Sequence, residues 1–319
     1  MIYTLTLNPA IDYTVFLDAF RPGELNRADK EVISWGGKGV NVSRTLNILG
    51  VPNIAMGLIA GFTGRALAEG LAAENIRTDL LSLTRGRTRI NVKIAACGET
   101  EINGTGPMVS PREFDILLGK IRALNKKDTL ILSGNAPASI SSVMYEDLLG
   151  AIAYSGACFI CDTSGGALTA AIRYRPFLIK PNLEEMSQLV GRELSTEDEI
   201  IAAARETVIK GVQNVLVSLG KEGAVLVTRQ EHIKVSAPEG RVYSAVGAGD
   251  AMLAAFLSAL PMEKELFLIS PKPEENEKLL YALRTAVAAG SAMAFSKDPA
   301  APLSLPEMQK LLDTLCQSK

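Results

Sequence analysis

Residues 244–256 read SAVGAGDAMLAAF: a glycine-rich turn, one carboxylate and then an apolar run. The apolar side chains recur at intervals of three and four residues, which predicts a helix with Asp250 in its first turn. Capping alone would account for an acid there. A cap does not need Gly247 and Gly249, which let backbone N–H groups approach an anion at the helix start. An anion hole beside a carboxylate suits phosphoryl transfer to an alcohol, because a hydroxyl loses its proton while negative charge builds up nearby.

Outside this stretch, short apolar runs alternate with helical patterns, which is typical of a parallel sheet with crossover helices. The predicted buried strands are NIAMGLIA, DTLILSG, ACFICDTS, FLIKPN and NVLVSLG. The predicted helices cover residues 64–74, 111–124, 141–154, 183–190 and 197–211. Ligands of open α/β sheets collect at the carboxyl ends of strands, so the polar tails SGN, DTSGG, KPN and SLGKEG are candidate site segments.

Two segments, residues 11–35 and 88–105, depart from this pattern and predict antiparallel strands. In TRINVKI the Ile and Val side chains face one side and the Arg, Asn and Lys side chains face the other. A two-faced sheet outside the main sheet predicts a small lid. Its apolar face needs a cover, which either a second subunit or the chain's own domain can provide, and we expect a homodimer formed through the lid.

Composition excludes several other functions. The chain has 319 residues, 47% of them hydrophobic, and its 33 Lys and Arg against 35 Asp and Glu give a net charge of −2. We therefore expect no nucleic-acid partner. The N-terminus resembles a strand rather than a signal peptide, and no apolar run has membrane-spanning length, so we expect a cytoplasmic protein without a membrane partner.

The histidine and cysteine content narrows the chemistry further. His232 is the single histidine and lies in a polar stretch that resembles a hairpin edge, so a Ser-His-Asp triad and a histidine metal cluster are excluded. Cys158 and Cys161 form a CxxC, but no second pair or nearby histidine completes a zinc site, which favours a buried strand. Catalysis is left to carboxylates, lysines, arginines and the backbone.

A second glycine cluster, WGGKGVNVSRTLNILG at 35–50, surrounds Lys38 and precedes a predicted helix. Its spacing is not that of a Walker A loop, and a plain tight turn is the alternative. Asn41 in the first turn and Asp12 after the first strand add polar groups suited to sugar hydroxyls.

Six motifs together resemble the ribokinase-like (PfkB) family of carbohydrate kinases, in order and over nearly the whole chain. They are LNPAID (7–12), GGKGVNVSR (36–44), TRINVKI (88–94), KPNLEE (180–185), VSLGKEGA (217–224) and VGAGDA (246–251). LNPAID, TRINVKI and EINGTGP look most like the sugar-phosphate branch, which contains 1-phosphofructokinases and tagatose-6-phosphate kinases. The resemblance implies one ribokinase-like domain over residues 1–319, a three-layer α/β/α fold with a small antiparallel β-sheet lid.

The resemblance also implies roles for individual residues. Asp250 would be the catalytic base beside an anion hole formed by Gly247, Ala248 and Gly249. The acceptor sugar phosphate would be bound by Asp12, Arg27, Gly37, Lys38, Gly39, Asn41, Arg89, Asn103 and Ser133. ATP and Mg²⁺ would be held by Lys180, Asn182, Glu185, Ser218, Gly220, Gly223, Gly249, Gly290 and Ser291, with Glu185 nearest the metal.

Ordinary structural roles are the alternatives to these assignments. Arg27 and Arg89 could be solvated strand residues, Lys180 a surface lysine and Glu185 a helix N-terminal acid. The chain also departs from the family pattern at Ala251, where a hydroxyl residue often follows the GAGD motif.

The expected activity is ATP-dependent phosphorylation of a ketohexose monophosphate, with fructose 1-phosphate converted to fructose 1,6-bisphosphate. Tagatose-6-phosphate kinase is the alternative within the family, and a non-catalytic sugar-phosphate sensor is an alternative of another class. A Rossmann dehydrogenase is disfavoured because no GxGxxG follows the first strand. The acidic stretch 261–278 is expected to be a surface insertion.

Overall fold

The computed structural model describes residues 1–96, 98–260, 273–298 and 301–317. The predicted insertion 261–278 therefore lies mostly outside the described residues, and only its last part appears, as the start of helix α10 (Pro273–Ala294). No helix in the described ranges is both long enough and apolar enough to cross a membrane.

The main sheet has nine strands in the order β13-β12-β11-β10-β9-β8-β1-β4-β5. The strands from β11 to β5 run parallel, and β12 and β13 add an antiparallel edge that carries His232, as expected. Their bounds are β1 (Ile2–Thr6), β4 (Asn53–Ala60), β5 (Thr78–Leu83), β8 (Thr129–Ser133), β9 (Cys158–Asp162), β10 (Leu178–Ile179), β11 (Asn214–Ser218), β12 (Ala224–Val227) and β13 (His232–Val235). All five predicted buried strands are confirmed, but β5, β12 and α5 (Gly165–Ile172) were not predicted.

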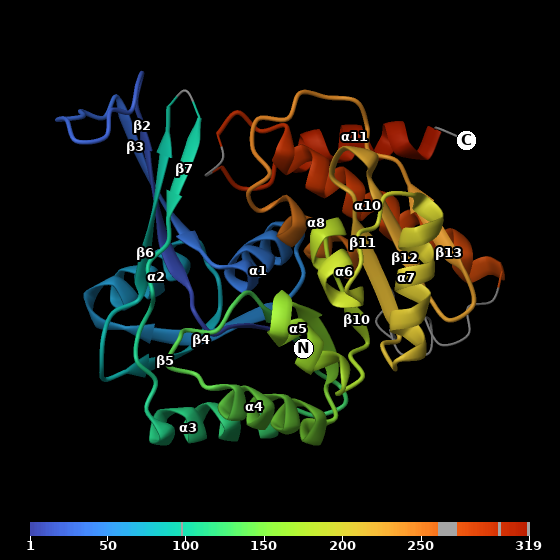
Figure 1. The fold of residues 1–319 in the computed structure, drawn as a ribbon, viewed down its shortest axis with the longest axis horizontal. Helices are drawn as coiled ribbons and strands as arrows, with labels where there is room; N and C mark the ends of the chain where they lie inside the picture. Colours follow the sequence, from blue (N-terminus) through green and yellow to red (C-terminus); the bar gives the residue numbers. More distant parts are fainter. Residues whose placement is uncertain (97, 261–272, 299–300, 318–319) are drawn as a thin grey trace.

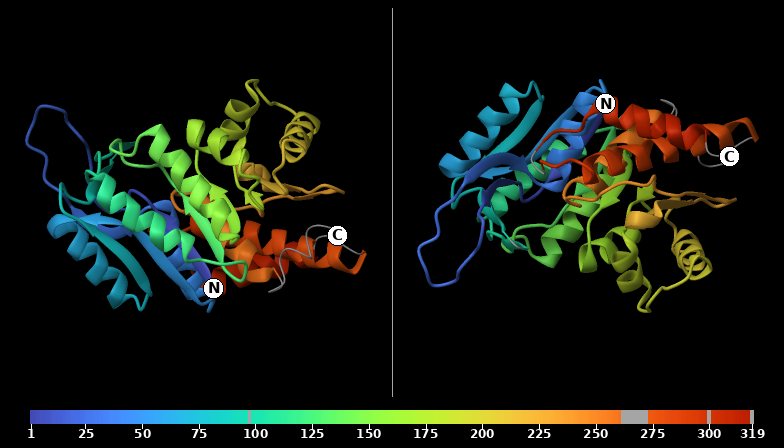
Figure 2. Two further views of the ribbon diagram at one scale, coloured as in Figure 1. Left: turned by 90° about the horizontal axis from the view of Figure 1, so that it is seen from below. Right: turned by 90° about the horizontal axis from the view of Figure 1, so that it is seen from above.

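Helices cover both faces of this sheet, so the expected three-layer architecture is confirmed (Figures 1 and 2). One face packs against α1 (Lys38–Ile48), α2 (Gly61–Ala73), α8 (Ala248–Ala259), α10 and α11 (Leu305–Gln317). The other packs against α3 (Pro111–Arg122), α4 (Ser142–Ser155), α5, α6 (Leu183–Val190) and α7 (Glu197–Ile209). Both Cys158 and Cys161 are buried in β9, as a core strand requires.

The lid is a separate four-stranded sheet with the order β3-β2-β6-β7. Its strands are β2 (Ala10–Phe16), β3 (Lys30–Gly36), β6 (Arg89–Ala95) and β7 (Glu99–Ile102). The outer pairs are antiparallel as predicted, but β2 and β6 pair in parallel, so the sheet is mixed. The reason lies in the main sheet, because β2 and β6 follow the parallel strands β1 and β5 and leave it in the same direction.

The root of the lid packs against the main domain through Trp35 at the end of β3. Gly70 of α2 faces the indole so closely that a Cβ at this position would overlap the ring. The alternation predicted for β6 is confirmed, since Asn91 contacts Asp12 on the inner face while Ile90 is exposed on the outer face. The lid therefore presents polar side chains to the space beside α1 and α8.

Candidate active site

The start of helix α8 holds the carboxylate that the sequence singles out. Gly247 is the N-cap residue and has a left-handed backbone (φ 74°), which a residue without a Cβ adopts without strain. Asp250 lies three residues further on, is buried, and its Oδ2 accepts a hydrogen bond of 2.8 Å from Asn41 Nδ2 of α1. Burial, with a smaller contribution from Asp162, raises the pKa of Asp250 to about 6. Asp250 is therefore ionised but basic at neutral pH, as a general base should be.

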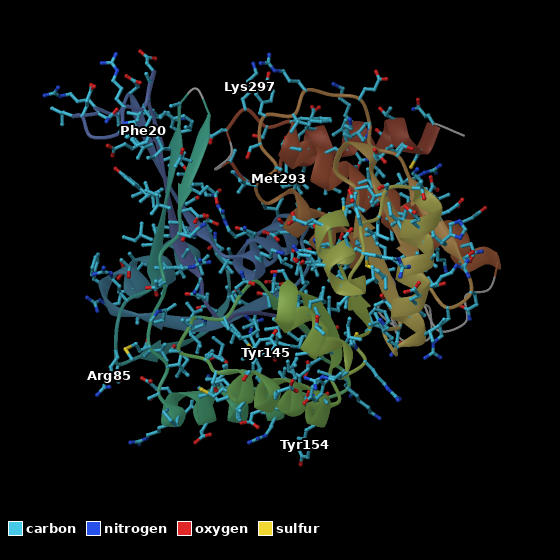
Figure 3. The ribbon with its side chains drawn as sticks, in the orientation of Figure 1. Phe20, Arg85, Tyr145, Tyr154, Met293 and Lys297 are labelled. Carbon is cyan, nitrogen blue, oxygen red and sulfur yellow. The ribbon has the colours of Figure 1, made fainter. Side chains whose placement is uncertain are left out.

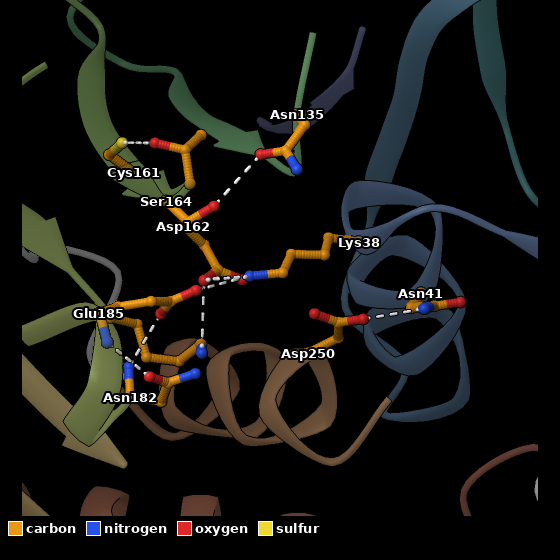
Figure 4. A network of polar contacts seen from close by, with 11 residues as sticks. Lys38, Asn41, Asn135, Cys161, Asp162, Ser164, Asn182, Glu185 and Asp250 are labelled. Atoms are coloured by element: carbon orange, nitrogen blue, oxygen red, sulfur yellow. Dashed lines mark hydrogen bonds and ion pairs between the residues drawn. The ribbon is translucent and has the colours of Figure 1, made fainter. Parts of the chain in front are cut away.

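A buried carboxylate that the sequence analysis did not assign lies beside this helix start. Asp162 ends strand β9, and its Oδ1 is 3.4 Å from Lys38 Nζ and 3.3 Å from Lys180 Nζ (Figure 4). The side chain of Asp162 is fully buried. The sequence feature that could have identified Asp162 is its position in DTSGG, at the carboxyl end of a strand, where α/β sheets bind ligands.

The ammonium group of Lys38 contacts carboxylates of the main domain. Its Nζ lies 3.7 Å from Glu185 Oε1 in addition to its contact with Asp162. Burial alone would lower the pKa of Lys38, but Asp162, Glu185 and Asp250 outweigh it and hold that pKa above its ordinary value. Lys38 is therefore positively charged at neutral pH, beside Asp162 and Glu185.

Asn182 and Glu185 form a capping box at the start of α6. Asn182 Oδ1 accepts from Glu185 N at 2.8 Å, and Glu185 Oε2 accepts from Asn182 N at 2.9 Å. The alternative role as a helix N-terminal acid is therefore real. It leaves Glu185 Oε1 facing Lys38 and the cavity, so both roles fit one side chain.

A cavity of about 880 Å³ brings most of the predicted site residues together. It extends from the inner face of the lid, past the start of α8, to the turn after β11 and the end of α10. Its walls include Asp12, Lys38, Asn41, Asn103, Lys180, Asn182, Glu185, Ser218, Gly220, Gly223, Gly247, Ala248, Gly249, Asp250, Gly290 and Ser291. The end near α10 is apolar, with Met252, Val287 and Phe295, which suits a nucleobase.

Five predicted residues do not line this cavity. Gly37 is the N-cap residue of α1, and a Cβ on Gly39 would overlap Thr6, so both are needed for packing. Ser133 is 1% exposed, at the end of β8. Arg27 is exposed in the segment that joins β2 to β3 at the lid tip, where Figure 3 places Phe20.

Arg89, the fifth of these residues, lies at the root of the lid. Its Nε donates to the backbone oxygen of Asn8 at 3.1 Å, and burial lowers its pKa although Asp12 opposes the shift. Arg89 is half-buried between the lid and the main domain, close to Asp12 but outside the cavity lining.

Asp12 anchors the acceptor side of the cavity. Asn91 Nδ2 donates to Asp12 Oδ1 at 2.8 Å, and Lys93 Nζ lies 3.6 Å from Asp12 Oδ2. A second cavity of about 310 Å³ continues past Asp12 and Lys93 toward Met293 and Lys297, which lie across from the lid in Figure 3. The sequence places Asn91 and Lys93 on the polar face of TRINVKI, and they have no predicted role. The alternation of polar and apolar residues in this segment is the feature that could have identified them.

Comparisons with known proteins agree with this arrangement. The family model described as pfkB family carbohydrate kinase matches residues 5–306. The chain is 37% identical to a 1-phosphofructokinase of Bacillus subtilis, over 93% of this chain and 94% of the relative. It is 38% identical to a D-tagatose-1-phosphate kinase of Bacillus licheniformis, over 93% of each chain. Phosphofructokinase-2 of Escherichia coli, solved with substrates and products, superposes with a TM-score of 0.88 at 32% identity over 99% of each chain.

Proposed function

The chain belongs to the pfkB family of carbohydrate kinases and is a sugar-phosphate kinase, and from this premise we propose that it phosphorylates fructose 1-phosphate. ATP is the proposed donor, and the product is fructose 1,6-bisphosphate. The observation that carries the proposal is Asp250, a buried carboxylate with a raised pKa at a glycine-started helix, which shares one cavity with Asp12. A non-catalytic sensor has no use for such a base.

In the proposed mechanism, Asp250 accepts the proton of the 6-hydroxyl as the oxygen attacks the γ-phosphorus of ATP. The Asn41 amide holds one carboxylate oxygen and leaves the other for the hydroxyl. The backbone N–H groups of Gly247, Ala248 and Gly249 stabilise the charge on the phosphoryl oxygens. Lys38 and Lys180, which both contact Asp162, add positive charge, and ADP leaves.

Mg²⁺ fits the carboxylates of the main domain. Asp162 Oδ2 is buried and has no hydrogen-bond partner among the described residues, while Glu185 lines the main cavity and shares the contact of Asp162 with Lys38 Nζ. Carboxylates hold Mg²⁺ largely through its retained waters, so we propose that Glu185 and Asp162 bind it in this way. When bound, the ion would neutralise charge on the nucleotide phosphates.

We propose that the phosphate of the acceptor is recognised by cations of the lid. Arg89 and Lys93 lie on the inner face of β6, on either side of Asn91. Arg side chains match phosphate oxygens geometrically, and a free sugar would leave these cations without the anion. Free fructose should therefore be a poor substrate.

The test compares kcat/KM for fructose 1-phosphate, D-tagatose 1-phosphate, tagatose 6-phosphate, fructose 6-phosphate and free fructose with Mg-ATP. D-Tagatose 1-phosphate is the second candidate, because the Bacillus licheniformis relative carries that name. A preference for either tagatose phosphate overturns the choice of sugar, but the proposed reaction, phosphorylation of a ketohexose monophosphate, remains valid. A preference for free fructose overturns the phosphate site, and binding without ADP release supports the sensor.

We also propose a homodimer through the outer face of the lid, within one kinase domain over residues 1–319. The strand register lines up Ile33, Tyr13, Val92 and Ile102 across all four strands. Ile33 and Ile102 are 58% and 59% exposed, an apolar row that a second copy would cover. Light scattering should detect a dimer at micromolar concentration that the I33D/I102D variant loses, whereas a monomeric wild-type protein contradicts the proposal.

A further inference from the structure

Asn91 joins two parts of the acceptor side that are far apart in sequence. Asn91 and Asp12 are register partners on the parallel strands β6 and β2. The Asn91 amide is 7% exposed, and both of its ends are used. Its Nδ2 donates to Asp12 Oδ1 at 2.8 Å, while its Oδ1 accepts from the backbone N–H of Gly104 at 3.3 Å.

The other contacts of Asp12 leave little freedom for its carboxylate. Lys93 Nζ lies 3.6 Å from Oδ2, and the carboxylate lies so close to Gly36 of β3 that a Cβ there would overlap it. The side chain of Asp12 is 14% exposed, and it lines the main cavity. Asn91, Lys93 and the bare backbone of Gly36 thus aim the carboxylate into the cavity.

The second partner of Asn91 adjoins another acceptor candidate. Gly104 directly follows Asn103, which lines the main cavity. The neighbouring Thr105 is held from the main domain, since Asn8 Nδ2 donates to its backbone oxygen at 3.4 Å. The hydrogen bond from Gly104 N to Asn91 therefore sets how near Asn103 lies to Asp12.

We infer that Asn91 is a positioning residue that holds Asp12 and the Asn103 segment in one geometry for the acceptor sugar phosphate. The inference rests on the proposed function and deepens its acceptor site. Asn91 acts through Asp12, because each polar atom of its amide is engaged by the protein. Acceptor binding should depend on Asn91, whereas the nucleotide end of the cavity should not.

The test measures KM for fructose 1-phosphate and for ATP in the wild-type protein, N91A, D12A and the double variant D12A/N91A. N91A should raise the acceptor KM about tenfold or more, as expected when a hydrogen bond to a charged group is lost, and should change the ATP KM less than about twofold. In the D12A background the same N91A change should raise the acceptor KM by a smaller factor, because only the contact with the Asn103 segment remains to be lost. If the factor for N91A is the same with and without the Asp12 side chain, Asn91 does not act through Asp12, and the inference is overturned.

A matched control separates positioning from general destabilisation. Asn53 is a buried amide (5% exposed) that donates to the backbone oxygens of Ser43 and Val51 outside the cavity. N53A should lower the melting temperature and leave both KM values unchanged. If N91A does not fold, N91S keeps a small polar group and answers the same question through calorimetric binding of fructose 1-phosphate.

Failure of the inference and failure of the proposed function give different results. An active wild-type enzyme whose acceptor KM is unchanged in N91A contradicts the positioning role alone. A wild-type protein that phosphorylates none of the ketohexose phosphates contradicts the proposed function, and with it the role given to Asn91.

Discussion

Helices α3 and α8 each have an acid at the third helical position, and the two acids behave in opposite ways. Glu113 of α3 belongs to a capping box with Ser110, and hydrogen bonds from Ser110 and Thr84 lower the pKa of Glu113 to about 2. Asp250 of α8 follows a glycine N-cap residue, bonds to Asn41 of another helix, and has its pKa raised to about 6. The hydrogen bond from the N-cap Ser110 is the largest cause for Glu113, whereas burial is the largest cause for Asp250.

The comparison shows how one helix position serves either stability or chemistry. A Ser at the N-cap uses the acid to satisfy the first N–H groups of the helix. A glycine offers no such partner, so Asp250 accepts a hydrogen bond from a neighbouring helix, and no side chain caps the start of α8. Capping is therefore the role of Glu113 and not of Asp250.

The largest expected effect is that of D250N. Removing a general base costs about 10²–10⁴-fold in rate, so kcat should fall by that factor while the acceptor KM changes little. Circular dichroism and thermal melting should report an intact fold, because the buried group becomes neutral without changing shape. Near-full turnover in a stable variant contradicts the role of Asp250.

The pH dependence of kcat should show the raised pKa. Asp250 accepts a proton only when ionised, so kcat should decrease as the pH falls through about 6. Below that pH the decrease should be about tenfold per unit. Steady-state rates at saturating substrates measure this profile, with enzyme stability checked at each pH. A flat profile down to about pH 4, near the ordinary pKa of an aspartate, would disprove it.

The E113A variant tests the other helix, and its effect should be on stability alone. The pKa of Glu113 is lowered to about 2 from 4.5, so its stabilising contribution is complete above pH 4.5 and is lost as the pH falls toward 2. Loss of the capping box should lower the free energy of unfolding at pH 7 by about 1 kcal/mol, with kcat unchanged. Urea unfolding at neutral and at acidic pH provides the measurement. If the difference in unfolding free energy between E113A and the wild-type protein increases as the pH falls, the prediction is wrong.

The smallest effect is expected for E185Q at the start of α6. Glutamine can still close a capping box with Asn182, so the fold should keep its stability while the charge facing Lys38 is lost. The magnesium concentration for half-maximal rate should then rise only about severalfold, because the ion keeps most of its waters. Magnesium titrations at fixed ATP compare the two proteins, and superimposable curves argue against a metal role.

Sequence patterns predicted the features that depend on neighbours in the chain. The five buried strands and the helix that begins beside Asp250 follow from short-range periodicity and turn residues. The position of Asp250 in a glycine-started first turn was visible in SAVGAGDAMLAAF alone. Family resemblance added roles for residues that lie far apart in sequence.

Tertiary structure decided which distant side chains meet. The contact between Asn41 and Asp250 spans 209 positions, and no local pattern predicts it. Asp162 became part of the site only because β9 ends between the two lysines, and Lys38 turned toward it because burial of a carboxylate requires a cation. The parallel pairing of β2 with β6 likewise depends on the direction in which each strand leaves the main sheet. Periodicity shows which residues share a face of a strand, but it shows neither the partner of that strand nor its direction.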